Sequence, residues 1–349
     1  MDIQKNISLA PFTSFGVGGM AENFIEASNA EQLILILETS DIRPIHLIGF
    51  GSNTLVSDNT LPGLVVCIRG GNMVFDNSGV TVDAGVWWDD VVRKSIENGL
   101  WGIELMSEIP GSVGAGIYIN ITAYGQTLGP LIEWVDAWNP EIQEVIRINK
   151  SELLWDYKQS IFQKPENREL VILRAHISLG RKMTEKLEYQ KAIDVAAELN
   201  LPIDSLQDRR RIIIEARRRA GSLWHPGKEE SKTVGSFFRN PIVDEQLAEE
   251  IMSFDETNKT AEQIKSMNLV HGGNTKRVSA AHVMLACGFK RGQQWRNVKL
   301  NNLNLLKIEA MPGATAQEIY SVAMLIQKSC RERLGVCLQF EAQLLGKFE

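Results

Sequence analysis

Three glycine-rich segments early in the chain constrain its fold most strongly. They are Phe15-Gly16-Val17-Gly18-Gly19, Gly49-Phe50-Gly51-Ser52-Asn53 and Ile109-Pro110-Gly111-Ser112-Val113-Gly114. Glycine adopts positive φ and brings backbone N–H groups close to a ligand, which suits a pyrophosphate, although any one of these segments alone is more simply an ordinary turn. None fits GxxxxGK[ST], and none is a GxGxxG between a strand and a helix with an acidic residue further on. These patterns argue against a P-loop nucleotidase and a Rossmann dehydrogenase.

The hydrophobic pattern predicts alternating strands and helices. Short apolar runs predict strands at 45–48, 80–82, 131–138, 144–148 and 170–179. Apolar residues three or four apart predict a helix from Trp88 to Asn98 and two more around 243–251 and 319–326. A polar, helix-prone stretch at 184–219 is a candidate lid or domain junction. Period-two alternation over 336–344 predicts a final strand with Glu341 on its polar face.

Composition limits the class of protein. The 349 residues, 44% of them hydrophobic, predict two or three domains with a sizeable core. A net charge of −6 argues against binding of nucleic acid by the whole chain. We expect a cytoplasmic protein, because no secretory signal or membrane-spanning run is present and the four cysteines show no CxxC spacing. The five histidines never form HExxH, so we expect no metal site.

Two polar segments could carry chemistry. The run 208–219 holds six arginines, all within the eleven positions 209–219, which suits a phosphate ligand and equally suits a solvated helix face. The stretch 233–241 combines small, hydroxyl, aromatic and amide side chains, as a loop that lines a pocket would. A lone Ser236 is usually a turn or cap residue, and no GxSxG surrounds it, so a catalytic role for Ser236 need not be nucleophilic.

Taken in order, these segments resemble the UDP-N-acetylenolpyruvoylglucosamine reductase (MurB) family of FAD flavoenzymes, over nearly the whole chain. The matching segments are 13–16, 49–58, 109–114, 120–125, 157–162, 235–241, 279–281 and 338–346. The resemblance implies an α+β protein with the FAD-binding fold of vanillyl-alcohol oxidase (PCMH type) and a third, α/β substrate-binding domain. The implied domains are 1–66 together with a C-terminal strand at 335–349, then 67–211, and last 212–334.

The same resemblance implies a reaction. NADPH would reduce non-covalently bound FAD, and hydride would then pass to an enolpyruvyl sugar nucleotide to give UDP-N-acetylmuramate for peptidoglycan. Ser236 would be the general acid, with Glu341 and Lys158 as further catalytic residues. Substrate-binding positions would be Tyr124, Tyr157, Tyr189, Arg219 and Asn240. Cofactor-binding positions would be Gly49, Phe50, Gly51, Ser52, Asn53, Ile109, Pro110, Gly111, Ser112, Gly114, Asn120, Ile121 and Gly125. We expect a monomer that binds no nucleic acid and no membrane.

The chain departs from the family pattern mainly on the substrate side. Lys158 replaces an arginine and so loses a bidentate fork. Ala220 stands where the family has a lysine, Ala286 where it has a glutamine, and Thr122 where it has a glycine; Leu338-Gln339-Phe340-Glu341 replaces Leu-Glu-Pro-Glu. These changes fit either a divergent cell-wall enzyme or a related flavoenzyme that acts on another small acid. A non-catalytic flavin- or nucleotide-binding module is a third possibility.

Overall fold

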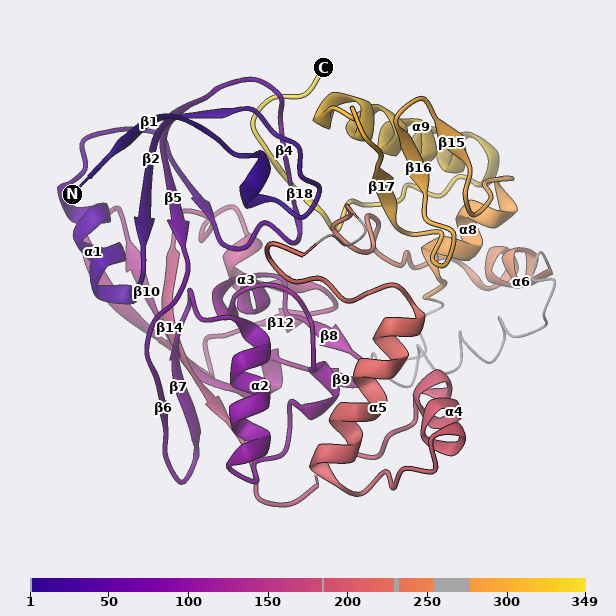
Figure 1. The fold of residues 1–349 in the computed structure, drawn as a ribbon, viewed down its shortest axis with the longest axis horizontal. Helices are drawn as coiled ribbons and strands as arrows, with labels where there is room; N and C mark the ends of the chain where they lie inside the picture. The colour runs from indigo at the N-terminus through magenta and orange to yellow at the C-terminus, as the bar shows by residue number, and fades with distance from the viewer. Residues whose placement is uncertain (1, 184, 229–231, 254–276) are drawn as a thin grey trace. The chain divides into compact units, whose positions relative to one another are not determined.

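The computed structural model describes residues 2–183, 185–228, 232–253 and 277–349. The chain, coloured by residue number in Figure 1, divides into two compact units. Unit 1 consists of residues 1–7, 21–50 and 62–226, and unit 2 of residues 8–20, 51–61 and 227–349. The division into three domains expected from the sequence stays a prediction.

The first sheet of unit 1 has four strands in the order β1-β2-β5-β3. Their bounds are β1 Gln4–Ser8, β2 Met20–Ala27, β5 Leu61–Ile68 and β3 Ile45–Ile48. β3 and β5 are parallel neighbours. The helix α1 (Ala30–Thr39) begins at Asn29, whose side chain accepts the N–H of Gln32, and it buries Leu33, Ile36 and Leu37 in a core shared with β2 and β5. β3, which leads directly into Gly49, therefore belongs to a well-anchored sheet.

The second sheet of unit 1 has five antiparallel strands in the order β11-β10-β14-β7-β6. Their bounds are β11 Glu144–Asn149, β10 Ile132–Asn139, β14 Val171–Ser178, β7 Gly79–Asp83 and β6 Met73–Phe75. The helices α2 (Trp88–Glu97) and α3 (Val113–Tyr118) share its core through Trp88, Val91, Val113 and Ile117, all at most 1% exposed. Burial of these apolar side chains positions the loop 107–112 between the two helices.

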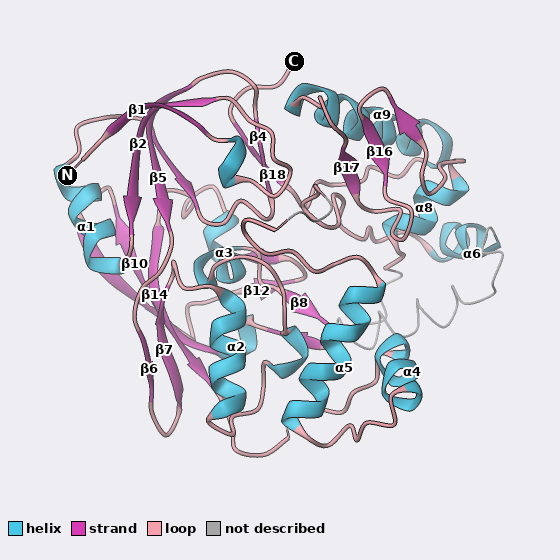
Figure 2. Ribbon diagram, in the orientation of Figure 1, coloured by secondary structure: helices cyan, strands magenta, loops and turns pink. Residues whose placement is uncertain are grey.

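Short elements complete unit 1 and are coloured by type in Figure 2. Two hairpins, β8–β9 (Thr122–Ala123 and Gln126–Thr127) and β12–β13 (Trp155–Asp156 and Gln159–Ser160), follow α3. The 3₁₀ turns are η2 Glu104–Met106, η3 Gly129–Leu131 and η4 Ile161–Gln163. The helices α4 (Gln190–Glu198) and α5 (Leu206–Arg219) pack side by side through Ala192, Val195, Ile212 and Ile213.

Unit 2 has its own core. Its elements are η1 Ala10–Phe12, β4 Thr54–Val56, α6 Glu245–Ser253, α8 Ala280–Ala286, β15 Gln294–Trp295, β16 Val298–Leu300, β17 Ile308–Ala310, α9 Ala316–Leu334 and β18 Gln343–Leu345. β15, β16 and β17 form one small sheet, and β18 pairs parallel to β4. Phe237, Phe238 and Ile319 are buried at the centre of this unit.

Most elements expected from the hydrophobic pattern are present, and one is wrong in extent. β3 covers 45–48 as predicted, and α2 ends at a C-cap on Asn98. The final strand, predicted over 336–344, is limited to Gln343–Leu345, with one bridge between Phe340 and Phe238. Burial still alternates from Val336 to Ala342, because extended backbone turns successive side chains to opposite sides even where no ladder forms. In the ranges that the structure describes, no helix is long and apolar enough to span a bilayer.

Candidate functional site

In unit 1, two of the predicted cofactor loops lie against each other. A β-carbon on Gly49 would lie 3.0 Å from the Oγ of Ser112. The second loop is held by backbone hydrogen bonds from Val113 N to Val86 O (3.0 Å) and from Gly114 N to Ala84 O (2.8 Å). Among the described residues, the N–H groups of Phe50, Gly111 and Ser112 donate to no backbone carbonyl. Amide donors that have no backbone partner, around close-packed glycine turns, fit the pyrophosphate of a dinucleotide.

The segment after this loop is a short helix that ends at Asn120. Ser112 caps α3 by accepting the N–H of Ala115 (3.3 Å). Asn120 is 2% exposed with φ +48°; its amide donates to the carbonyl of Asp156 (2.9 Å) and accepts the N–H of Gly129 (2.8 Å). Ile121 is buried in the core of the second sheet. The side chain of Asn120 therefore joins the end of α3 to the segments at Gly129 and Asp156. In this way it would fix the backbone of a cofactor site without binding the cofactor through its side chain.

Two hairpin turns carry four predicted site residues. Tyr124 and Gly125 form the turn of β8–β9, with φ +49° and +95°, and Tyr157 and Lys158 form the turn of β12–β13, with Lys158 at φ +56°. A non-glycine residue with positive φ is uncommon and costs about 1–3 kcal/mol, and such strain collects at functional sites. The β12–β13 hairpin is anchored to the end of α3, because Ser160 Oγ and Gln163 Nε2 both donate to the carbonyl of Tyr118 (2.6 and 2.7 Å).

Tyr124 lies beside Tyr189 and close to Arg217. The two rings meet edge to face, with centroids 5.0 Å apart. Burial raises the pKa of Tyr124 to about 12, and the charge of Arg217 opposes that rise. Tyr189 is the N-cap residue of α4 and is 36% exposed. The phenol of Tyr124 therefore stays protonated, as a hydrogen-bond donor, at neutral pH.

A network of charges stands next to the cofactor loop 109–114. Arg210 on α5 binds Asp89 of α2 through two 2.6 Å contacts, and Asp89 accepts the N–H of Glu108 (2.6 Å). Glu108 has φ +58°, and its Oε2 lies 2.8 Å from His225 Nε2. Desolvation and the charge of Asp89 raise the pKa of Glu108. The loop that begins at Ile109 and Pro110 is thus tied to α2 and α5 by charge-assisted contacts.

In unit 2, the segment Gly51–Asn53 is braced from two sides. Gly51 has φ +61°, and a β-carbon there would lie 2.1 Å from the carbonyl oxygen of Phe12, so only glycine fits. Ser14 N donates to the carbonyl of Gly51 (3.1 Å). Asn53 donates through Nδ2 to the carbonyl of Glu341 (3.1 Å), and Gln343 N donates to the carbonyl of Asn53 (2.8 Å). Ser52 lies between these two braced residues and is half-buried.

The segments that carry Ser236 and Glu341, the residues predicted to take part in proton transfer, are hydrogen-bonded to each other in unit 2. The bridge between Phe238 and Phe340 is closed by hydrogen bonds from Glu341 N to Phe237 O and from Arg239 N to Gln339 O, both 2.8 Å. This register places Phe237 opposite Glu341, so Ser236 and Glu341 start from opposite faces of the ribbon. The two residues that follow Ser236, Phe237 and Phe238, are at most 1% exposed. Their burial fixes the backbone that carries Ser236.

Asn240 and Lys307 lie on either side of this ribbon in unit 2. The Oδ1 of Asn240 accepts the N–H of Ala280 at the start of α8 (3.0 Å). Lys307 is 2% exposed and forms a bridge with Ser236 on the other edge. No motif points to Lys307; its one signal in the sequence is a lysine inside the apolar run 305–308.

The arginines of α5 differ in ways the sequence does not show. Arg219, predicted to bind substrate, pairs with Glu198 (2.5 Å) and Glu215 (2.8 Å), and its side chain is 38% exposed. Arg217, which the sequence does not single out, is 9% exposed and near Tyr124. Its position four residues after buried Ile213, on the same face of an amphipathic helix, is the signal that could have separated it from Arg218 and Arg219.

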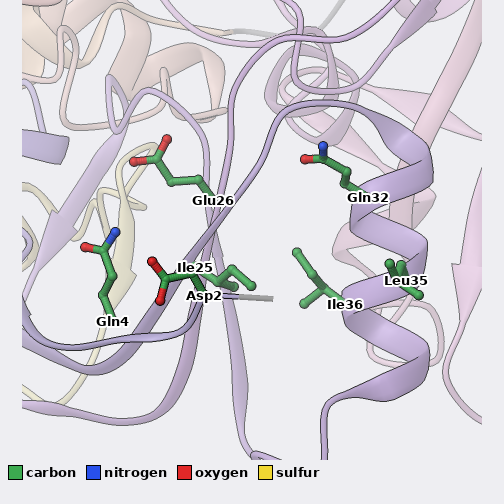
Figure 3. Close-up of a pocket in the computed structure, with 7 residues that line it drawn as sticks. All are labelled: Asp2, Gln4, Ile25, Glu26, Gln32, Leu35 and Ile36. Carbon is green, nitrogen blue, oxygen red and sulfur yellow. The ribbon is translucent and has the colours of Figure 1, made fainter.

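Two surface hollows lie in unit 1. One, of about 300 Å³, is lined by Asp2 and Gln4, by Ile25 and Glu26 of β2, and by Gln32, Leu35 and Ile36 of α1 (Figure 3). None of the predicted site residues lines it. The other, of about 460 Å³, is lined by 154–156, 159, 160 and 163–165, along the hairpin that carries Tyr157 and Lys158.

Comparisons with known proteins cover both units. Residues 21–140 match an FAD-binding domain family, and residues 226–345 match the C-terminal domain of UDP-N-acetylenolpyruvoylglucosamine reductase. A protein of Thermobifida fusca with that name is 27% identical and matches over 98% of each chain. One from Streptomyces avermitilis is 29% identical, over 97% of this chain and 93% of the relative. Over almost its whole length the chain is therefore similar to UDP-N-acetylenolpyruvoylglucosamine reductases.

A solved structure of a UDP-N-acetylenolpyruvylglucosamine reductase (MurB) from Thermus caldophilus shares the fold of this chain. It covers 99% of this chain and 100% of its own, with a TM-score of 0.63 and 19% identity. Together with the FAD-binding domain match, this confirms the expected α+β fold with an FAD-binding domain of the vanillyl-alcohol oxidase type.

Proposed function

We propose that this chain is an FAD-dependent reductase that converts UDP-N-acetylenolpyruvoylglucosamine into UDP-N-acetylmuramate, with NADPH as electron donor. One observation carries this conclusion: relatives named for that reaction match over almost their whole length, with both the FAD-binding and the C-terminal family regions present in order. The same assignment makes the chain an enzyme of peptidoglycan synthesis. Its monomeric state and cytoplasmic location stay predictions.

The residues of the glycine loops suit the cofactor. Amide donors of Phe50, Gly111 and Ser112 would hold its phosphates, and the buried supports behind them keep those donors in place. When bound, FAD supplies a hydride for the β-carbon of the enolpyruvyl group. The polypeptide binds and orients the ligands, and it supplies the proton that the second half of the reduction needs.

We assign that proton to the Oγ of Ser236. Hydride addition to the β-carbon leaves negative charge on the α-carbon and carboxylate of the substrate. Serine is a weak acid in water, but an α-carbanion is basic enough to take its proton when the hydroxyl is held in place. The burial of Phe237 and Phe238 supplies that rigidity. Glu341, whose backbone joins the same ribbon, would polarise the enolate or relay the proton.

Lys158 would meet the carboxylate of the substrate. It keeps the positive charge of the arginine found in the family and lacks the planar fork that binds a carboxylate with two parallel hydrogen bonds. Its left-handed backbone shows that the hairpin holds it in an uncommon conformation. We assign Tyr157 in the same turn to substrate binding, together with Tyr124, Tyr189 and Asn240.

The test begins with the absorbance spectrum of the purified protein. We expect an oxidised flavin band near 450 nm, loss of that band on anaerobic addition of NADPH, and its return on addition of the enolpyruvyl sugar nucleotide. Ser236→Ala should be reduced by NADPH normally and reoxidised by substrate about 10²–10⁴-fold more slowly. Reduction by NADPH without reoxidation by this substrate in the unmodified protein would disprove the proposal.

A second candidate is a flavoenzyme of the same family that acts on another small acid. Lys158, Ala220 and Ala286 favour it, because each removes a polar contact of the family pattern. Each lost contact is worth roughly 0.5–3 kcal/mol, so together they could weaken sugar-nucleotide binding by orders of magnitude. Reoxidation of the reduced protein by other enoyl or keto acids, and not by the sugar nucleotide, would select this candidate.

A further inference from the structure

We infer that Arg217 binds an anionic oxygen of the substrate, a phosphate or carboxylate oxygen, beside Tyr124 and Tyr189. This inference rests on the proposed function, because the ligand it names is the sugar nucleotide. Arg219, the helix residue that the sequence pattern favours for this role, has two carboxylate partners of its own.

Arg217 is a buried charge with one neutral partner. The side chain is 9% exposed, and its Nη2 donates to the carbonyl of Ser222 (2.7 Å). Its Nε has no hydrogen-bond partner. A desolvated guanidinium is unfavourable unless an anion accompanies it, and a carbonyl dipole supplies no opposite charge. Desolvation accordingly lowers the pKa of Arg217.

The nearest carboxylates are already engaged. Asp89 takes two 2.6 Å contacts from Arg210, and Glu108 lies 2.8 Å from His225. Both act on Arg217 at longer range. In the ranges that the structure describes, no ion pair joins Arg217 to an acidic side chain within 4.0 Å. A negative ligand would complete the charge balance at this place.

The neighbours of Arg217 supply hydrogen-bond donors. Tyr124 is the first residue of a strained turn, and its ring meets that of Tyr189 at 81°. A protonated phenol and an unused guanidinium N–H together offer donors that match the oxygens of a phosphate or a carboxylate. The strain at Tyr124, at φ +49°, is the kind of feature that a binding role explains.

A purely structural role accounts for only part of these contacts. Arg217 closes the turn after α5, since Ser222 N donates to the carbonyl of Arg217 (2.8 Å) while Nη2 donates back to Ser222. That turn uses one of the five N–H donors of the guanidinium and needs no positive charge. Neighbouring Arg218, 63% exposed and paired with Glu215, belongs to the solvated face and makes a matched control.

The test measures binding of uridine diphosphate and of uridine to the flavin-loaded protein by titration calorimetry, together with KM for the enolpyruvyl substrate. Arg217→Gln should raise the Kd for uridine diphosphate at least tenfold and change the Kd for uridine by less than twofold. For Arg217→Lys, the Kd for uridine diphosphate should lie between the values of the unmodified protein and of Arg217→Gln, because lysine keeps the charge and lacks the planar fork. Arg218→Gln should leave all three values within twofold. Flavin content and the thermal midpoint show whether each variant folds, and Arg217→Met is a second uncharged replacement if the glutamine variant does not fold.

Two results support the inference and locate the anion. A loss of uridine diphosphate binding places it on the diphosphate, and a tenfold rise in KM with uridine diphosphate binding intact places it on the enolpyruvyl carboxylate. Unchanged binding and KM, equal losses for uridine and uridine diphosphate, no uridine diphosphate binding by the unmodified protein, or a larger effect of Arg219→Gln would overturn it. Failure of the proposed function is a separate outcome: the unmodified protein would bind uridine diphosphate and never turn over the enolpyruvyl substrate.

Discussion

Side chains of the same type take different roles in this protein because their burial differs. Arg217 and Arg219 lie two positions apart on α5, which turns them to different sides of the helix. One is buried beside a tyrosine, and the other pairs with glutamates at the surface. The same reasoning separates Tyr124, whose pKa is raised to about 12, from an ordinary surface tyrosine.

The first residue-scale prediction concerns the ionisation of Tyr124. Burial favours the neutral phenol, so the folded pKa, about 12, lies above the unfolded value of about 10. This contribution to stability is fully present below pH 10 and is lost as pH rises through 12. Absorbance titrations at 295 nm of the unmodified protein and of Tyr124→Phe should differ by one tyrosine that stays protonated to at least pH 11. A titration of Tyr124 near pH 10 in folded protein would contradict the assignment.

A second residue-scale prediction concerns Lys158. Arginine restores a bidentate contact with a carboxylate, worth about 1–2 kcal/mol over a single charge-assisted bond. We therefore expect Lys158→Arg to raise kcat/KM for the enolpyruvyl sugar nucleotide by about 5–30-fold. Lys164→Arg, at the rim of the neighbouring hollow, is the control and should change kcat/KM by less than twofold. A decrease in the first variant would favour a site adapted to another acid.

At the scale of elements, short segments are held by a few polar contacts and not by long ladders. α9 begins with a capping box in which Thr315 and Glu318 each accept the other's backbone N–H (3.1 Å both ways). The end of α3 is closed by Asn120, Ser160 and Gln163. Such contacts position loops because every unpaired backbone group at a helix end costs free energy.

The capping box gives a prediction for α9. Thr315→Ala removes the acceptor for Glu318 N and should lower the free energy of unfolding by about 1 kcal/mol. Thr315→Ser keeps the hydroxyl and should cost a few tenths of a kcal/mol at most. Urea denaturation followed by tryptophan fluorescence measures both. Equal losses in the two variants would mean that the hydroxyl bond is not the stabilising feature.

Asn120 gives a prediction for the hairpins that carry site residues. Asn120→Ala leaves the N–H of Gly129 and the carbonyl of Asp156 without this partner in a buried place, which should cost about 2–4 kcal/mol. Asn98→Ala removes one exposed bond to the carbonyl of Lys94 and should cost no more than about 0.5 kcal/mol. Thermal unfolding and flavin content are the measurements. A cost below 1 kcal/mol for the first variant would refute the linking role of Asn120.

At the scale of the whole molecule, the predicted cofactor residues belong to both compact units. Gly49 and Phe50 lie in unit 1, and the segment Gly51–Asn53 lies in unit 2. The chain enters unit 2 early, for residues 8–20 and 51–61, and returns to it from residue 227 onward. Unit 2 is therefore built from segments far apart in the sequence, as the pairing of β18 with β4 shows.

Removal of the cofactor gives a prediction for the stability of the whole molecule. A ligand that binds only folded protein stabilises it by RT ln(1 + [L]/Kd), about 2.7 kcal/mol at a hundredfold excess over Kd. Flavin-free protein should therefore unfold at a lower temperature than protein reconstituted with FAD, by an amount that grows with FAD concentration. Differential scanning calorimetry across a range of FAD concentrations is the measurement. A midpoint independent of FAD would contradict specific binding.

The sequence by itself determined the local elements, the likeness to known reductases and the positions that could carry chemistry. β3, α2 and the β10–β11 pair follow from hydrophobic period and turn residues, which act over a few positions. The tertiary structure alone decided which arginines of α5 are buried, where the last strand ends and which residue pairs with Ser236. These depend on contacts between residues more than 50 positions apart, such as Ser236 with Lys307 and Asn53 with Glu341. Burial and pairing partners are properties of the packed chain, and no local pattern encodes them.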